Sequence, residues 1–104
     1  MSKRYSSKNS NVVLTERQAQ MLIAAASDRL ETNSGPAYFE TTKSAFMRVG
    51  YKLSSFDLIW FDVLNITERF YMLYASDAGK EWLEGCEERP VLPPLMAYVA
   101  NMPG

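Results

Sequence analysis

The fold of this chain depends most on Glu68–Gly85, which reads ERFYMLYASDAGKEWLEG. The aromatic run from Phe70 to Ala75 has the composition of a β-strand. Ser76 follows it and predicts a helix start, because its hydroxyl can accept a hydrogen bond from the free amides of the first turn. An aspartate comes next, where a negative charge suits the positive end of the helix dipole. The stretch therefore predicts a strand that leads directly into a capped helix.

Three further elements are expected upstream of this stretch. A strand is predicted over Phe56–Val63, and a helix over Thr41–Val49 comes before it, with Gly50 as its left-handed stop. A leading helix is expected to begin at Thr15, where Gln18 completes a capping-box pattern three residues later. The apolar stripe of this leading helix is formed by Leu22, Ile23, Ala26 and Leu30.

The length of 104 residues fits one domain. We expect residues 1–11 to be a flexible basic arm and residues 12–88 to be the folded domain. Residues 89–104 are expected to be a tail that prolines interrupt, with one short helix near its end. The apolar residues of that tail helix are Leu95, Met96, Tyr98 and Val99.

The composition argues against several classes of function. The chain has no histidine, which is the commonest general base and metal ligand, and it has no phosphate-cradling glycine loop. Its one cysteine, Cys86, is surrounded by carboxylates that disfavour a thiolate. We therefore predict that the protein is not an enzyme and has no metal or cofactor. No apolar run approaches the roughly 18 to 20 residues that span a bilayer, so we expect a cytoplasmic protein without a membrane partner.

The net charge of −1 hides an asymmetry between the two halves of the chain. Residues 1–52 hold eight basic and four acidic side chains, for a balance of +4, whereas residues 53–104 hold three and eight, for a balance of −5. A basic front and an acidic back would allow one face of the molecule to meet phosphate groups while the other avoids them.

The order of the predicted elements resembles that of small bacterial and phage winged-helix proteins, over about residues 14–85. In that family a leading helix begins with a pattern similar to Leu14–Gln18, LTERQ. A short, threonine-led recognition helix that ends in glycine resembles Thr41–Gly50, TTKSAFMRVG. A wing strand that runs into a helix resembles Tyr74–Lys80, YASDAGK, although Ala75 occupies a position where the family usually has leucine.

The resemblance implies a small α+β domain with a winged-helix fold, a two-stranded β-hairpin and an extra C-terminal helix. It also implies a DNA-binding regulator, which we expect to be a homodimer. Base edges in the major groove are contacted by side chains such as Arg, Asn, Gln and Ser. The residues predicted to contact nucleic acid are Thr42, Lys43, Ser44, Arg48, Lys52, Arg17, Lys3 and Arg4.

The predicted hairpin has apolar residues on both faces and motivates a second hypothesis. A two-stranded ribbon buries only one face, so the other face needs a cover. We place Trp60 on the core face, together with Phe56 and Leu58. The residues predicted to form the spare face and a protein interface with the tail are Ile59, Phe61, Tyr71, Leu95, Met96, Tyr98 and Val99. The alternative function is therefore a phage or mobile-element protein that inhibits a host machine by protein binding, for example an anti-CRISPR.

Overall fold

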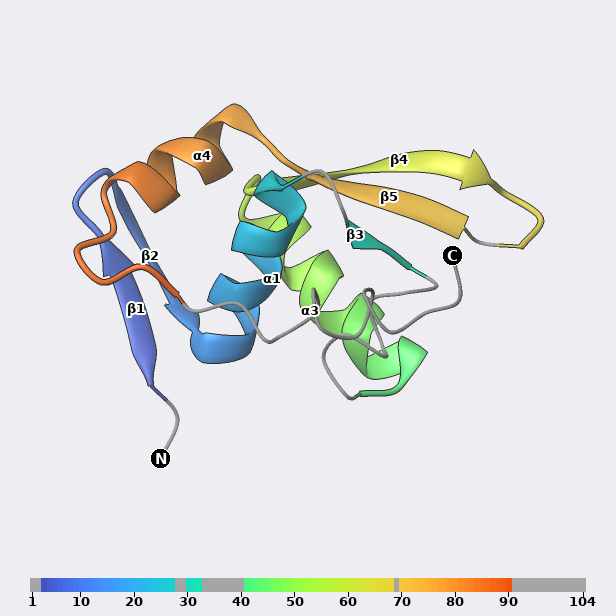
Figure 1. Ribbon diagram of the computed structural model, residues 1–104, viewed down its shortest axis with the longest axis horizontal. Coiled ribbons are helices and arrows are strands. Elements are labelled where there is room, and N and C mark those ends of the chain that lie inside the picture. The colour runs from blue at the N-terminus through green and yellow to red at the C-terminus, as the bar shows by residue number, and fades with distance from the viewer. Residues whose placement is uncertain (1–2, 28–29, 33–40, 69, 91–104) are drawn as a thin grey trace, which may run out of the picture.

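The computed structural model describes residues 3–27, 30–32, 41–68 and 70–90. Within these ranges the chain forms a small α+β domain with helices and two antiparallel sheets (Figure 1). In chain order the elements are β1 (Arg4–Ser7), β2 (Ser10–Thr15), α1 (Glu16–Ala26), β3 (Leu30–Glu31), α3 (Lys43–Ser55), β4 (Ile59–Asn65), β5 (Phe70–Ala75) and α4 (Asp77–Glu84). The α+β class predicted from the sequence is confirmed, and the winged-helix fold stays a prediction.

The first described segment is a β-hairpin, so the prediction of a flexible arm over residues 1–11 is wrong for its described part. Strands β1 and β2 pair antiparallel with Tyr5 opposite Leu14, and both side chains are buried. The hairpin also contacts the end of α4, because the side-chain amide of Asn9 donates to the carbonyl of Glu81 at 2.8 Å. The side chains of this segment alternate between the core and solvent, as in a strand. The polar composition of the segment concealed this alternation in the sequence.

The second sheet has the order β3–β5–β4, and its two long strands form a hairpin that extends away from the helices (Figure 1). Strand β5 has the predicted bounds, whereas β4 begins at Ile59 rather than at Phe56. Phe56 instead caps the end of α3, and Asp57 adopts a positive φ of 61° in the turn that follows. This left-handed turn prevents an earlier start of the strand.

Helix α3 does not end at Gly50, as the sequence predicted, but continues to Ser55. Of the two adjacent threonines that could open this helix, Thr42 is the cap, because its hydroxyl accepts a hydrogen bond from the Ala45 amide at 3.2 Å. Gly50 is buried inside the helix, where an added Cβ would lie 3.2 Å from Cζ of Phe61. The glycine therefore permits close packing of strand β4 against the helix and does not act as a stop.

Helix α1 begins as predicted but ends earlier than its apolar stripe suggested. Thr15 and Gln18 form the capping box, with reciprocal hydrogen bonds between side chain and backbone. The helix ends at Ala26, so the fully buried Leu30 belongs to strand β3 and faces Leu73 across the sheet. Its burial was predicted correctly, but the helical spacing was coincidental.

Helix α4 closes the core on the side of the N-terminal hairpin. Ser76 caps it as predicted, and its hydroxyl accepts from the Gly79 amide at 3.1 Å. Trp82 is fully buried, and its indole nitrogen donates to the carbonyl of Val12 at 2.9 Å. A Cβ on Gly79 would lie 2.1 Å from the carbonyl oxygen of Leu58, so this turn of the helix touches backbone directly.

The two faces of the β4–β5 hairpin are the reverse of the prediction. Ile59 is 1% exposed and Phe61 is partly buried against the core, whereas Trp60 is 61% exposed. In the register Ile59 faces Ala75 and Trp60 faces Tyr74, which places Trp60 on the outward side. Both faces are rich in apolar residues, and the pattern therefore does not identify the buried face.

The predicted tail helix lies outside the described residues, and so do its interface positions Leu95, Met96, Tyr98 and Val99. Over the part of the chain that the structure describes, none of the helices has the length and apolar character needed to cross a bilayer.

Candidate nucleic-acid interface

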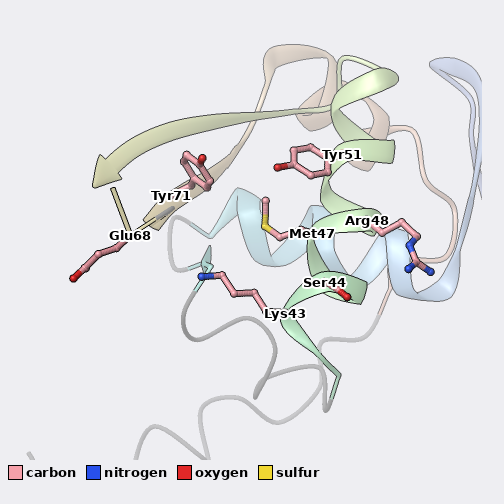
Figure 2. Close-up of a pocket in the computed structure, with 7 residues that line it drawn as sticks. All are labelled: Lys43, Ser44, Met47, Arg48, Tyr51, Glu68 and Tyr71. Carbon is pink, nitrogen blue, oxygen red and sulfur yellow. The ribbon is translucent and has the colours of Figure 1, made fainter. Parts of the chain in front are cut away.

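Helix α3 presents two neighbouring rows of side chains outside the core. One row is Lys43, Met47 and Tyr51, and it faces the β4–β5 hairpin (Figure 2). The other contains Ser44 and Arg48, whose side chains point away from that hairpin in the same view, although both residues line the edge of the hollow between α3 and the hairpin. Each row follows the i, i+4 spacing of neighbours on one helix face.

The second row continues to Lys52 and Ser55, and all four of its residues are exposed. Together with Gln18 at the start of α1, its C-terminal part lines a shallow hollow between the two helices. The Lys52 ammonium lies 5.2 Å from the centroid of the Phe56 ring, a cation–π contact that positions its stem. The row therefore offers two cations and two hydroxyls on one accessible helix face.

Helix α3 carries three cations and no acidic side chain. Five exposed carboxylates belong to α4 or to the segment that follows it. Figure 1 shows α4 and α3 on opposite sides of α1. The five residues are Asp77, Glu81, Glu84, Glu87 and Glu88. The charge asymmetry between the two halves of the sequence is therefore seen in the fold, with cations on α3 and this cluster of carboxylates around α4.

The first row of α3 and the hairpin enclose a hollow of about 610 Å³ (Figure 2). Tyr51 reaches into it from the helix and Tyr71 faces it from β5, and Glu68 borders it at the turn that joins the two strands, with its carboxylate directed outward. The ring of Phe61 connects the two tyrosines, with centroids 5.5 Å from Tyr51 and 6.0 Å from Tyr71. The hollow therefore has an aromatic wall, and Lys43 and Glu68 supply opposite charges at its mouth.

The other predicted nucleic-acid contacts lie apart from α3. Lys3 forms an ion pair with Glu88, and this hydrogen-bonded carboxylate raises the pKa of the Lys3 ammonium. Arg4 is on β1 and Arg17 on α1, and α1 lies between β1 and α3 (Figure 1). Arg17 lines a separate hollow at the start of α1, with Thr15, Glu16 and Gln20. Lys3 and Arg4 are therefore not brought together with the α3 residues.

The predicted contribution of Thr42 is limited by its structural role. Its hydroxyl oxygen is the acceptor of the helix cap, so this acceptor is already used within the protein. Lys43, Ser44, Arg48 and Lys52 are all exposed on α3, as a contact surface requires.

Sequence reasoning missed several members of the surface. Tyr51 and Ser55 were not predicted as site residues because the helix was expected to end at Gly50, and Met47 was not predicted although it lies inside the expected helix. Continuing the helical spacing from Lys43 through residues 47 and 51 would have found the first row. The contribution of Gln18 and Glu68 depends on the packing of distant segments, and no local signal predicts it.

Of the predicted protein-interface residues, Ile59 is a core residue, and that prediction is wrong. Phe61 and Tyr71 are half-buried and line or support the hollow beside α3. The outward face of the hairpin carries instead Trp60, Met72 and Tyr74, and exposed apolar side chains continue to the turn at Leu64 and Ile66.

Little in the described residues suggests metal or thiol chemistry. In that part of the chain, the His, Cys, Asp and Glu side chains form no group of three that could hold a metal ion. Burial raises the pKa of the Cys86 thiol, and its sulfur donates to the carbonyl of Glu88 at 3.0 Å. The neutral thiol is therefore favoured at neutral pH.

Comparisons with known proteins identify no relative. No protein-family model, no curated protein and no solved structure matches the chain.

Proposed function

We propose that this protein is a nucleic-acid-binding regulator of the winged-helix type, which uses α3 to contact DNA. The observation that carries the proposal is the surface of α3, where three cations and two serines are exposed on a helix without a carboxylate. A helix of 13 residues is long enough to lie along several base pairs in the major groove.

The exposed row of α3 supplies both kinds of contact that duplex recognition needs. Arg48 and Ser44 are suited to base edges, because guanidinium and hydroxyl groups pair with acceptors in the major groove. Lys52 extends this row and is suited to a phosphate. The acidic residues around α4 are repelled by DNA and favour an approach with α3 foremost.

The order of elements also supports the winged-helix proposal. Helix α3 is followed directly by the β4–β5 hairpin, and the short strand β3 pairs with the second strand of that hairpin. The hairpin then lies beside α3, on the side of Lys43, Met47 and Tyr51, as a wing would (Figure 2). Such a regulator would act in the cytoplasm of the producing or host cell.

The test is a binding titration of full-length protein with a mixed-sequence DNA duplex, from about 50 mM salt upward. We expect retention at low salt and a steep loss of affinity as salt rises, because phosphate contacts release counterions. Arg48→Glu should weaken binding about tenfold or more and flatten the salt slope.

The matched control is Lys80→Glu, which makes the same change in charge on the exposed surface of α4. It should alter affinity much less, because α4 lies away from the α3 surface. Absence of wild-type binding near 50 mM salt would refute the regulator proposal, and equal effects of both variants would refute the role of α3.

A second candidate function is protein binding through the outward face of the β4–β5 hairpin. Trp60 is 61% exposed, and Leu64 and Ile66 at the turn are 46% and 75% exposed. Large apolar side chains that gather on one face often mark an interface. The partner would be a host protein or, for a homodimer, a second copy of this chain.

Light scattering of wild type and Trp60→Ala tests the dimer. A wild-type dimer that Trp60→Ala converts into a monomer would support it. A wild-type monomer at tens of micromolar would exclude stable self-association and leave a different protein as the partner to be sought.

A further inference from the structure

We propose that the hollow between α3 and the β4–β5 hairpin binds one unstacked nucleotide, with its base against the tyrosines and its phosphate at Lys43. This inference rests on the proposed function for the source of the nucleotide, namely an unpaired position in a bound nucleic acid. The volume of about 610 Å³ lies within the usual range for small-molecule sites.

The aromatic wall supplies a stacking surface for a base. Tyr51 is 58% exposed, so most of its ring is accessible to a ligand. The Phe61 ring lies behind it at 5.5 Å and limits its movement. Tyr71 is held from the other side, because its amide donates to the Thr32 hydroxyl at 3.1 Å and its carbonyl accepts from the Thr32 amide at 3.0 Å. Aromatic rings held in this way suit a base, because every base has a π-face.

The charged groups at the mouth match the polar parts of a nucleotide. Lys43 and Glu68 lie at the opening from opposite elements (Figure 2), and within the described ranges the structure records no ion pair for either. An ammonium group attracts phosphate, and a carboxylate accepts hydrogen bonds from the amino group of a base. The turn that carries Glu68 is ordered by a hydrogen bond, since the Asn65 side chain accepts from the Glu68 amide at 3.1 Å.

Different residues of α3 are assigned to this nucleotide site and to the duplex surface. Lys43, Met47 and Tyr51 face the hollow, and Arg48 lies at its edge, whereas Lys52 and Ser55 line only the shallow hollow beside Gln18. A duplex lying against Lys52 and Ser55 therefore leaves the first hollow accessible to a nucleotide that leaves the base stack. The Watson–Crick edge of an unpaired base can donate to Glu68, from the amino group of adenine or from the ring N–H of thymine, so this carboxylate does not select between the two bases.

The experiment compares three fluorescent or competing ligands: a fully paired duplex, the same duplex with one unpaired adenine, and free adenosine monophosphate. Wild type should bind the duplex with the unpaired adenine about 5- to 100-fold more tightly than the paired duplex, the range expected for stacking of one base. Tyr51→Ala should abolish this difference and leave affinity for the paired duplex unchanged. Tyr51→Phe, which keeps the ring, should retain it.

Three further variants make the result specific. Trp60→Ala removes an equally exposed ring from the opposite face of the hairpin and should have no effect on the preference. Glu68→Gln should reduce the preference for the duplex with the unpaired adenine over the paired duplex. Lys52→Glu, at a residue outside the hollow, should weaken both duplexes equally, which distinguishes the duplex surface from the hollow.

The outcomes separate the two proposals. If wild type binds both duplexes with equal affinity, the nucleotide site is refuted while the DNA-binding function stands. If neither duplex binds but adenosine monophosphate does, in a manner that Tyr51→Ala abolishes, the hollow is a site for free nucleotides and the regulator proposal fails. If none of the three ligands binds, both proposals are refuted.

Discussion

The two tryptophans have opposite environments, and this makes them a direct test of the structure at single residues. Trp82 is fully buried and donates a hydrogen bond to Val12, whereas Trp60 is 61% exposed. Trp82→Ala should lower the free energy of unfolding by about 3–5 kcal/mol through cavity formation. Trp60→Ala should change it by less than about 0.5 kcal/mol. Urea denaturation of both variants measures the difference, and comparable losses would contradict the orientation of β4.

Cys86 provides a pH-dependent prediction. Burial raises the pKa of its thiol in the folded state. The contribution to stability is therefore fully present below the thiol pKa of the unfolded chain, and it is lost as pH rises through the higher pKa of the folded state. A thiol-specific reagent should react more slowly with the folded protein than with the protein in urea, at each pH from 7 to about 9. Faster reaction in the folded state would show that the sulfur is activated.

The residues that cap helices were predictable from the sequence, whereas the solvent exposure of individual side chains was not. The hydroxyls of Thr15, Thr42 and Ser76 all cap helices, because a cap depends only on the chain within three residues of it. The exposure of Trp60 depends on which face of β4 meets the helices. Ile59 and Trp60 are both large and apolar, so composition gives no preference between them.

At the scale of elements, two glycines in helices differ in what surrounds them. An added Cβ on Gly79 would lie 2.1 Å from the carbonyl oxygen of Leu58, and this backbone oxygen cannot move without displacing the strand that follows it. Gly79→Ala should therefore destabilise the fold by about 3 kcal/mol or more.

Gly50→Ala is the matched substitution in α3. Its Cβ would lie 3.2 Å from the outer edge of the Phe61 ring, a tight contact that a small ring movement relieves. The gain of about 1 kcal/mol in helix propensity opposes this cost, so the net change should stay within about 1 kcal/mol. Thermal unfolding of the two variants checks the contrast. If Gly50→Ala lowers the stability as much as Gly79→Ala does, the Phe61 ring is rigidly held.

The length of α3 explains why the candidate site was only partly predictable. Lys43, Ser44 and Arg48 were found because they precede Gly50, which is normally a stop signal. Tyr51 and the serine at the end of the helix were missed because that signal is overridden by packing. The position of Phe61 in the folded molecule shows that Gly50 allows close packing of the Phe61 ring and does not end the helix.

At the scale of the whole molecule, the N-terminal hairpin is part of the core. Tyr5 is 5% exposed, and the Lys8 amide donates to the carbonyl of Gly85 at 2.9 Å. Tyr5→Ala should therefore lower the free energy of unfolding by about 3–5 kcal/mol, as for other large aromatic residues in cores. The exposed neighbour on the same strand provides the control, and Ser6→Ala should be close to neutral. An unchanged urea midpoint for Tyr5→Ala would restore the flexible-arm interpretation.

The α+β class was predictable because local sequence patterns indicate the order of helices and strands. The pairing of β1 and β2 with the end of α4 was not, because it joins segments that are remote in the sequence. The isolated bridge between Ser7 and Cys86 is an example, since neither residue carries a signal for the other.

The contact between the N-terminal hairpin and α4 has a consequence for how the protein is made. The indole of Trp82 and the carbonyl of Val12 are 70 residues apart along the chain. At a synthesis rate of roughly 5–20 residues per second, Val12 waits about 4 to 14 s on the ribosome before its partner is added. During that interval the apolar side of the first hairpin has no α4 to cover it. Newly made chains should therefore depend on chaperones until the second tryptophan emerges, and codons that slow translation between these two positions should lower the yield of folded protein.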